Sequence, residues 1–574
     1  MTMKNLKYLY LLFLTTLFIS CEDFIDIQPQ DRISVDNYFR TATDIEKYVI
    51  KYYSSFPGHG IGSLPASEGA SDNLILATPN LVLNGTRSPN TGSWTSQWSN
   101  IRSINILFDK LESVEDDLSL YSQFLGEAYF FRAWFYFNMV STYGDVPYYT
   151  SEIALGDEDQ LLKPRDPRTY VVDQVLGDLD NAIKHLGLRS SNGNSRLNKE
   201  TALAFKSRIA LFEGSWQKYH AGSDFGTSGA DPNKYFQIAV EASEELINGT
   251  AYTKGIYSTG NPEKDYYDLF GKDNMSSLDE VLFYRIANKD EGLGHNLQFS
   301  LIERPDSKAI TWSLVSSFLG QDGNPYDYLA LAANIKGNSF LSKIAEDVDP
   351  RLKSTIWIPG DVLISSTDQI FDKPFLDLGA EGRSQTGFQV KKFSNPDSEG
   401  ASAGYGQNSE TGRIYFRYAE VLLNYAEALY ELNGSLAVPE LNSIRERVGM
   451  PDFTVIPQSN YGSSLVDYGY TISDELYAIR NERRVELALE GFREDDYRRW
   501  AAHKLFQGKR PKGYPFEPSD FPNFSPDLDE NGLIDFFQSE MTDGYGFKED
   551  RDYLTSIPQD EITLNENLEQ NPGW

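Results

Sequence analysis

The densest group of chemically active side chains lies in the segment 480–490. Its glutamates recur at four-residue spacing, Glu482, Glu486 and Glu490, and arginines lie between them, Arg480, Arg483 and Arg484. A glycosidase needs two carboxylates on opposite sides of the bond that it cleaves. Residues four apart on a helix share one face, and neighbouring arginines keep carboxylates ionised. We therefore expect a structural ion-pair network here rather than a catalytic acid and base.

Histidine and cysteine offer no metal-hydrolase pattern. The five histidines share no metal-ligand spacing, and the sequence has no HExxH or Cys-His motif. They are His59, His185, His220, His295 and His503. The sequence therefore gives no support to metal-dependent hydrolysis.

The segment 527–535, DLDENGLID, places oxygen ligands at the spacing of an EF-hand loop. The candidate ligands are Asp527, Asp529, Asn531 and Asp535, with Gly532 at the turn. Position twelve is Gln538 instead of the bidentate glutamate, and Glu540 comes two residues late. Two interpretations remain open, a structural calcium site and an acidic Asx-turn loop. No other cofactor is expected.

Aromatic side chains beside polar loops suggest the binding of sugars. The chain has 35 Tyr, 34 Phe and 8 Trp. A sugar ring stacks its C–H face on an aromatic ring, and its hydroxyls need polar groups at the edge. The candidate platforms are Trp94, Trp312, Tyr266 and Tyr267, and the candidate edge contacts are Asp72 and Asn73. Trp98 starts an apolar helical pattern and is assigned to packing.

The net charge constrains the ligand class. The formal net charge is −32 and the isoelectric point is near 4.6. Such a surface repels nucleic acid, so we expect no nucleic-acid partner. It favours a neutral glycan over a polyanionic one, unless a local basic patch overrides the net field.

Helices must position most of these residues. In 125–144, Ala128, Phe131, Phe135 and Met139 recur at helical spacing, and Gly144 closes the helix. Similar units, with small residues where helices would cross, look like tetratricopeptide-type repeats. We expect a mainly α fold, with a helical-repeat scaffold and a large loop-rich irregular region. One domain would span 21–574: scaffold mainly in 21–250 and 412–505, loop-rich ligand-binding region mainly in 255–411, irregular segment in 506–574.

The N-terminus has the order of a secretory signal. Lys4 and Lys7 precede an apolar stretch over 8–19, and Cys21 follows Ser20. About a dozen apolar residues are too few to span a bilayer, which takes about 20. Residues 1–20 are therefore predicted to be a signal peptide. Cys21 resembles the lipid-modified first residue of a lipoprotein, and several acyl chains anchor a protein stably.

Several segments together resemble the SusD/RagB family. They are CEDFID, FRAWFYFNMVSTYGDVPYY, EALYELNG, LNSIRERVGM, NERRVELALEGFREDDYRRW and IPQDEITLNENLEQNPGW. They span nearly the whole chain in the order of the family.

This resemblance implies a lipid-anchored outer-membrane protein that faces the cell exterior. It implies a partner, a SusC-like TonB-dependent transporter, on which the protein forms a lid, and a captured ligand that is usually a glycan. It implies no catalysis. Two alternatives remain: a surface protein that binds peptides or other nutrients, and a surface glycosidase.

Overall fold

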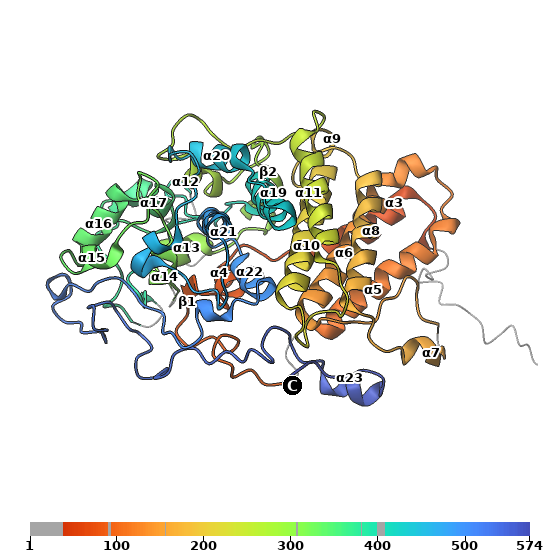
Figure 1. Ribbon diagram of the computed structural model, residues 1–574. Coiled ribbons are helices and arrows are strands. Elements are labelled where there is room, and N and C mark those ends of the chain that lie inside the picture. Colours follow the sequence, from red (N-terminus) through yellow and green to blue (C-terminus); the bar gives the residue numbers. More distant parts are fainter. Residues whose placement is uncertain (1–37, 90–92, 155, 306–307, 380–381, 399–407) are drawn as a thin grey trace, which may run out of the picture.

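The computed structural model describes residues 38–574 apart from 90–92, 155, 306–307, 380–381 and 399–407 (Figure 1). Cys21 and the predicted signal peptide lie outside the described residues. The described chain is mainly helical, as expected from the sequence. Within it, no helix is both long enough and apolar enough to cross a membrane.

Helices are the main regular elements of the described chain, and six short strands lie between them. The helices of the first half are α3 (Ala42–Ile50), α4 (Ser63–Glu68), α5 (Trp94–Asp109), α6 (Leu118–Tyr143), α7 (Glu158–Leu161), α8 (Arg168–His185), α9 (Arg189–Asn192), α10 (Lys199–Tyr219), α11 (Pro232–Asn248) and α12 (Asp265–Phe270). Those that follow are α13 (Leu297–Ile302), α14 (Trp312–Val315), α15 (Tyr328–Ala332), α16 (Gly337–Asp347), α17 (Arg351–Thr355), α19 (Tyr418–Asn433), α20 (Val438–Glu446), α21 (Asp474–Glu486), α22 (Arg493–Arg499) and α23 (Gln559–Leu564). The strands are β1 (Leu74–Ile75), β2 (Val281–Arg285), β3 (Ala309–Ile310), β4 (Val362–Ile364), β5 (Gln369–Ile370) and β6 (Arg413–Arg417).

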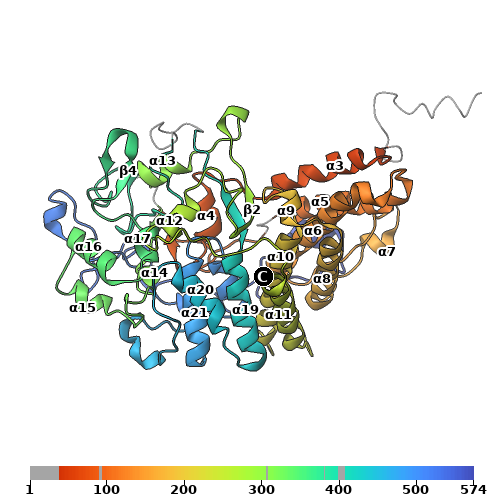
Figure 2. The ribbon, with the colours of Figure 1, turned by 90° about the horizontal axis from the view of Figure 1, so that it is seen from above.

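The long helices form the tetratricopeptide-like scaffold that the sequence predicts. In Figures 1 and 2, α5, α6, α8, α10 and α11 lie side by side, α19 and α21 follow, and short helices and loops form the opposite end. A Cβ added at Gly214 of α10 would lie 2.8 Å from the Phe236 ring of α11. This crossing therefore needs a residue without a side chain, as expected for paired repeat helices.

Helix α6 confirms the predicted buried face. Ala128, Phe131, Phe135 and Met139 are all buried. The helix ends at Gly144, whose φ of +75° suits glycine. Other faces of α6 are buried as well, because the helix packs against α3, α5 and α8.

The pairing of β1 with β3 sets the positions of the predicted ligand-binding residues next to these strands, Asp72, Asn73 and Trp312. It is antiparallel, with Leu74 opposite Ile310 and Ile75 opposite Ala309. It brings two segments that are far apart in the sequence into contact. The other pairs are β2 with β6 and β4 with β5.

The charged segment 480–490 is part of an ion-pair network, as expected. However, its glutamates pair with cations outside the segment and not with the interleaved Arg480, Arg483 and Arg484. Glu486 contacts Arg447 at 2.6 Å, Arg417 at 2.7 Å and Arg351 at 3.0 Å. Burial alone would raise the pKa of Glu486, but these three guanidinium groups hold it well below its usual range. One detail was wrong: α21 ends at Glu486, so Glu490 lies beyond the helix and approaches Arg417 at 2.7 Å from there.

Candidate functional site

Two of the predicted ligand-binding segments meet at one place. The β1–β3 pairing sets Asp72 and Asn73 beside Thr311 and Trp312. The Thr311 amide donates to the Asn73 carbonyl at 3.0 Å, and the Thr311 hydroxyl donates to the Asp72 carbonyl at 2.6 Å. Trp312 is the first residue of α14, and Thr311 caps that helix. Local pairing therefore fixes the tryptophan next to the aspartate.

A cavity of about 280 Å³ opens at this junction. The half-buried Trp312 lines it, and its ring packs behind on Phe340 and Tyr328 at centroid distances of 5.9 and 6.0 Å. Serine residues also line the cavity, namely Ser71, Ser313, Ser316, Ser463 and Ser464. An aromatic wall with several hydroxyls suits a ligand that has both apolar faces and polar edges.

The Asp72 carboxylate lines the cavity but is already engaged. Arg493 donates to it at 2.6 Å and Arg484 at 2.9 Å. Burial would raise the pKa of Asp72, and the two arginines hold it well below its usual range. We expected the Asp72 carboxylate to bond the hydroxyls at the edge of a sugar ring. In the structure it is paired with the two buried arginines, Arg484 and Arg493.

Asn73 does not face the cavity. It is 2% exposed, and its Oδ1 accepts from Arg484 at 3.1 Å. The Asn73 side chain therefore satisfies another buried group, as deeply buried polar residues usually do, and its position gives no support to the expected edge contact.

Trp94 was also misplaced by sequence reasoning. It begins α5 and is only 4% exposed, with its ring against Trp98 at 5.6 Å and Tyr143 at 5.1 Å. A helix starts at this residue, so the ring turns into the core instead of standing on a loop. Trp94 and Trp98 both line a second cavity of about 630 Å³, which residues of α7 and α23 also line.

The two tyrosines of α12 are likewise packed. Tyr266 is 1% exposed, its hydroxyl donates to the Glu486 carbonyl at 2.7 Å, and it receives a hydrogen bond from Lys392. The burial of Tyr266 gives no support to the prediction that its ring stacks on ligand. The half-buried Tyr267 bonds Ser394 at 2.8 Å and does not line the Trp312 cavity.

The acidic loop 527–535 is an Asx turn. Asp529 accepts from the amides of Asn531 and Leu533, both at 2.9 Å. Asp535 is buried and paired with Lys512 at 2.5 Å and Arg510 at 2.8 Å. Two cations therefore hold the Asp535 carboxylate that calcium would need. No group of three His, Cys, Asp or Glu residues that could hold a metal ion occurs among the described residues, and these contacts favour the Asx-turn interpretation of the loop.

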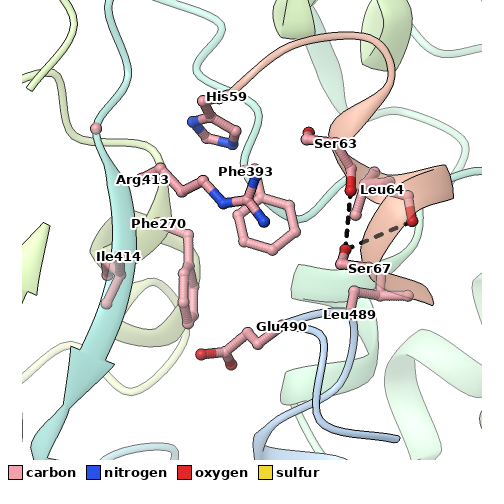
Figure 3. A pocket seen from close by; sticks show the side chains of 11 residues that line it. His59, Ser63, Leu64, Ser67, Phe270, Phe393, Arg413, Ile414, Leu489 and Glu490 are labelled. Atoms are coloured by element: carbon pink, nitrogen blue, oxygen red, sulfur yellow. Dashed lines mark hydrogen bonds between the residues drawn. The ribbon is translucent and has the colours of Figure 1, made fainter. Parts of the chain in front are cut away.

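A third hollow is too small for a ligand. Figure 3 shows His59, Phe393 and Arg413 around a space of about 30 Å³, which holds about one water molecule. The rings of His59 and His295 lie 4.8 Å apart between centroids and are tilted by 39°. Burial and the neighbouring His295 hold the pKa of His59 well below its usual range.

Sequence reasoning missed one wall of the Trp312 cavity. The run Lys509-Arg510-Pro511-Lys512 lines it, and the Lys512 carbonyl accepts from the Trp312 amide at 2.8 Å. The sequence did contain a signal for this basic wall: three cationic residues occur within four positions, although the chain as a whole is strongly acidic.

Comparisons with known proteins agree with this architecture. A model described as "SusD family" matches residues 280–574, and one described as "Starch-binding associating with outer membrane" matches residues 68–211. SusD-like protein P2 of Formosa agariphila is 24% identical over the full length of both chains.

Solved structures show the same fold. A SusD-like protein of Bacteroides fragilis is 24% identical, covers 95% of this chain and 100% of its own, and has a TM-score of 0.71. A SusD-like carbohydrate-binding protein of the same species is 21% identical, covers 93% and 100%, and also scores 0.71. With a family model spanning just over half of its length, the chain belongs to the SusD family.

Proposed function

We propose that this protein captures glycan at the cavity beside Trp312. The observation that carries the proposal is the half-buried tryptophan that lines a 280 Å³ cavity among serine hydroxyls. The ring offers an apolar face to a sugar, and the hydroxyls offer partners to its edge. The larger cavity at Trp98 is more apolar in its lining and ranks second as a glycan site.

The proposed role is binding without catalysis. Among the described residues, the carboxylate in the cavity wall is Asp72, and two arginines keep it ionised with both oxygens engaged. A general acid must carry a proton near neutral pH, and an attacking carboxylate needs an oxygen that can reach the substrate. Asp72 meets neither requirement.

Delivery would require a partner. We propose a lipid anchor at Cys21, exposure at the cell exterior, and a SusC-like TonB-dependent transporter in the outer membrane that takes over the glycan. The support for this part is the family membership and the N-terminal signal pattern.

The test is calorimetric titration of the chain without residues 1–20 against a panel of neutral and acidic oligosaccharides. Trp312→Ala should weaken binding by about tenfold or more, and Trp98→Ala, in the other cavity, should bind as the wild type does. Weakened binding in Trp98→Ala together with wild-type binding in Trp312→Ala would instead assign the glycan site to the Trp98 cavity. Shortening of a polymer during incubation would contradict a purely binding role.

A further inference from the structure

The Trp312 cavity has an unusual charge for this protein. Lys509, Arg510 and Lys512 all line it, although the chain carries a net charge of −32. Salt screens charges beyond about 8 Å at physiological ionic strength. The ligand in the cavity therefore experiences mainly the side chains nearby and not the acidic surface as a whole.

Two acids near the cavity, Asp535 and Asp72, are each shared by two cations. Asp535 lies 2.8 Å from Arg510 and 2.5 Å from Lys512, and Asp529 reaches Lys512 only at 3.9 Å. Asp72 is shared in the same way by Arg484 and Arg493. Within the described chain, the buried Nη1 atoms of both these arginines lack a hydrogen-bond partner. The acids therefore leave positive charge uncompensated around the cavity.

Among the described residues, no carboxylate forms an ion pair with Lys509. Its ammonium donates to the carbonyls of Lys504 at 3.0 Å and Leu505 at 3.3 Å, and no carboxylate of the described residues lies within 4.0 Å of it. Burial lowers the pKa of the Lys509 ammonium, and the more distant Asp467 and Asp72 only partly oppose this. An ammonium has three donors, and the two carbonyls leave one donor to meet a ligand.

We infer that the captured glycan is anionic, with a carboxylate or sulfate group bound at Lys509 while a sugar ring stacks on Trp312. This inference rests on the proposed glycan site and replaces the expectation of a neutral ligand, since the local basic patch outweighs the net field. A charge-assisted hydrogen bond to such an oxyanion is shorter and stronger than one to a sugar hydroxyl.

Matched pairs of probes test the inference on the wild type. One pair is an oligogalacturonide and its fully methyl-esterified form; the other is a sulfated galactan oligosaccharide and its desulfated form. At least one acidic member should bind about tenfold or more tightly than its neutral partner, and the pair that does so identifies the carboxylate or the sulfate. That preference should shrink between about 50 mM and about 500 mM NaCl.

Variants then assign the preference to one side chain. Lys509→Met should remove most of the preference for the acidic member, measured as the ratio of the two dissociation constants. Lys504→Met, an exposed lysine outside the cavity lining, should keep it. Thermal melting should show that all variants are folded.

Each result decides between the two proposals. Equal or tighter binding of the neutral members, lost in Trp312→Ala, would overturn the anionic inference and leave the glycan site standing. Unchanged preference in Lys509→Met would also overturn the inference. Absence of binding to every oligosaccharide would overturn the glycan site and the inference together.

Discussion

The carboxylate of Asp72 and the guanidinium of Arg493 form a buried bidentate ion pair beneath the proposed glycan site, with Nε to Oδ1 at 2.6 Å and Nη2 to Oδ2 at 3.0 Å. Arg484 reaches the same carboxylate at 2.9 Å. One acid near the start of the chain thereby balances two bases near its end. Its removal leaves two buried cations without a counter-ion.

Asp72→Ala should therefore lower the free energy of unfolding by about 3–5 kcal/mol, as expected for a broken buried ion pair. Denaturant titration measures this loss. Asp527→Ala, which removes an exposed carboxylate, should stay within about 0.5 kcal/mol of the wild type. Equal stability of the two variants would show that the buried pair contributes nothing measurable.

Glu486→Gln should cost a similar amount, about 3–5 kcal/mol, because Arg351, Arg417 and Arg447 then lose their shared charge. The folded pKa of Glu486 lies below its unfolded value. Its contribution is therefore present above about pH 4 and is lost as pH falls further.

The control is Glu446→Gln, which alters an exposed glutamate of α20. It should unfold at the wild-type denaturant concentration and keep the wild-type acid sensitivity. A Glu486→Gln protein that is stable but no longer binds glycan would instead assign this network to ligand binding.

Glu68 should produce the opposite pH dependence. Burial raises its pKa to about 7 despite hydrogen bonds from Gly491 and Ser71. Between about pH 4.3, the unfolded value, and pH 7, the folded state holds a proton that the unfolded state has released. Stability should therefore fall as pH rises through this range, by up to about 4 kcal/mol. Glu68→Gln should remove this part of the slope, whereas Glu446→Gln should keep it; identical slopes in both variants would contradict the buried, raised-pKa carboxyl.

Sequence patterns predicted the parts of this molecule that depend on local spacing. The buried face of α6 and its end at Gly144 follow from residues a few positions apart. The density of charge in 480–490 predicted an ion-pair network but not its partners, since Glu486 pairs with the distant Arg417. Such periodicity reports which side of a helix is apolar. It does not report which distant segment covers that side.

The candidate site depended on contacts that no local pattern encodes. Trp312 and Asp72 meet only because β1 pairs with β3, and Asp72 meets Arg493 from the far end of the chain. Tyr266 was taken for a loop residue because polar residues surround it in sequence. Its ring is buried by Glu486 and Lys392, which are remote in the chain.

Trp94→Ala should reduce stability rather than binding. The side chain is 4% exposed and packs against Trp98 and Tyr143, so truncation should cost about 3–5 kcal/mol. Trp312→Ala, at a half-buried ring, should cost less stability and lose glycan affinity. Calorimetry and melting on the same samples separate the two effects. A Trp94→Ala protein that melts at the wild-type temperature but has lost its glycan affinity would instead show that Trp94 contacts the ligand.

The last prediction concerns Cys21, which the N-terminal pattern marks as the lipid-modified residue. Expressed in a cell that processes lipoproteins, the full chain should incorporate labelled fatty acid and sediment with the membrane fraction. Cys21→Ala should abolish labelling and leave the protein outside the membrane fraction or uncleaved, since the acyl chains on Cys21 are the proposed anchor. Ser20→Ala, which keeps a small residue before the cysteine, should label as the wild type does. The glycan affinity of the chain without residues 1–20 should be unaffected by the cysteine change, because the Trp312 cavity is formed by residues from Ser71 onward. Fatty-acid labelling that persists in Cys21→Ala would show that the anchor is attached elsewhere and would remove this residue from the proposed function.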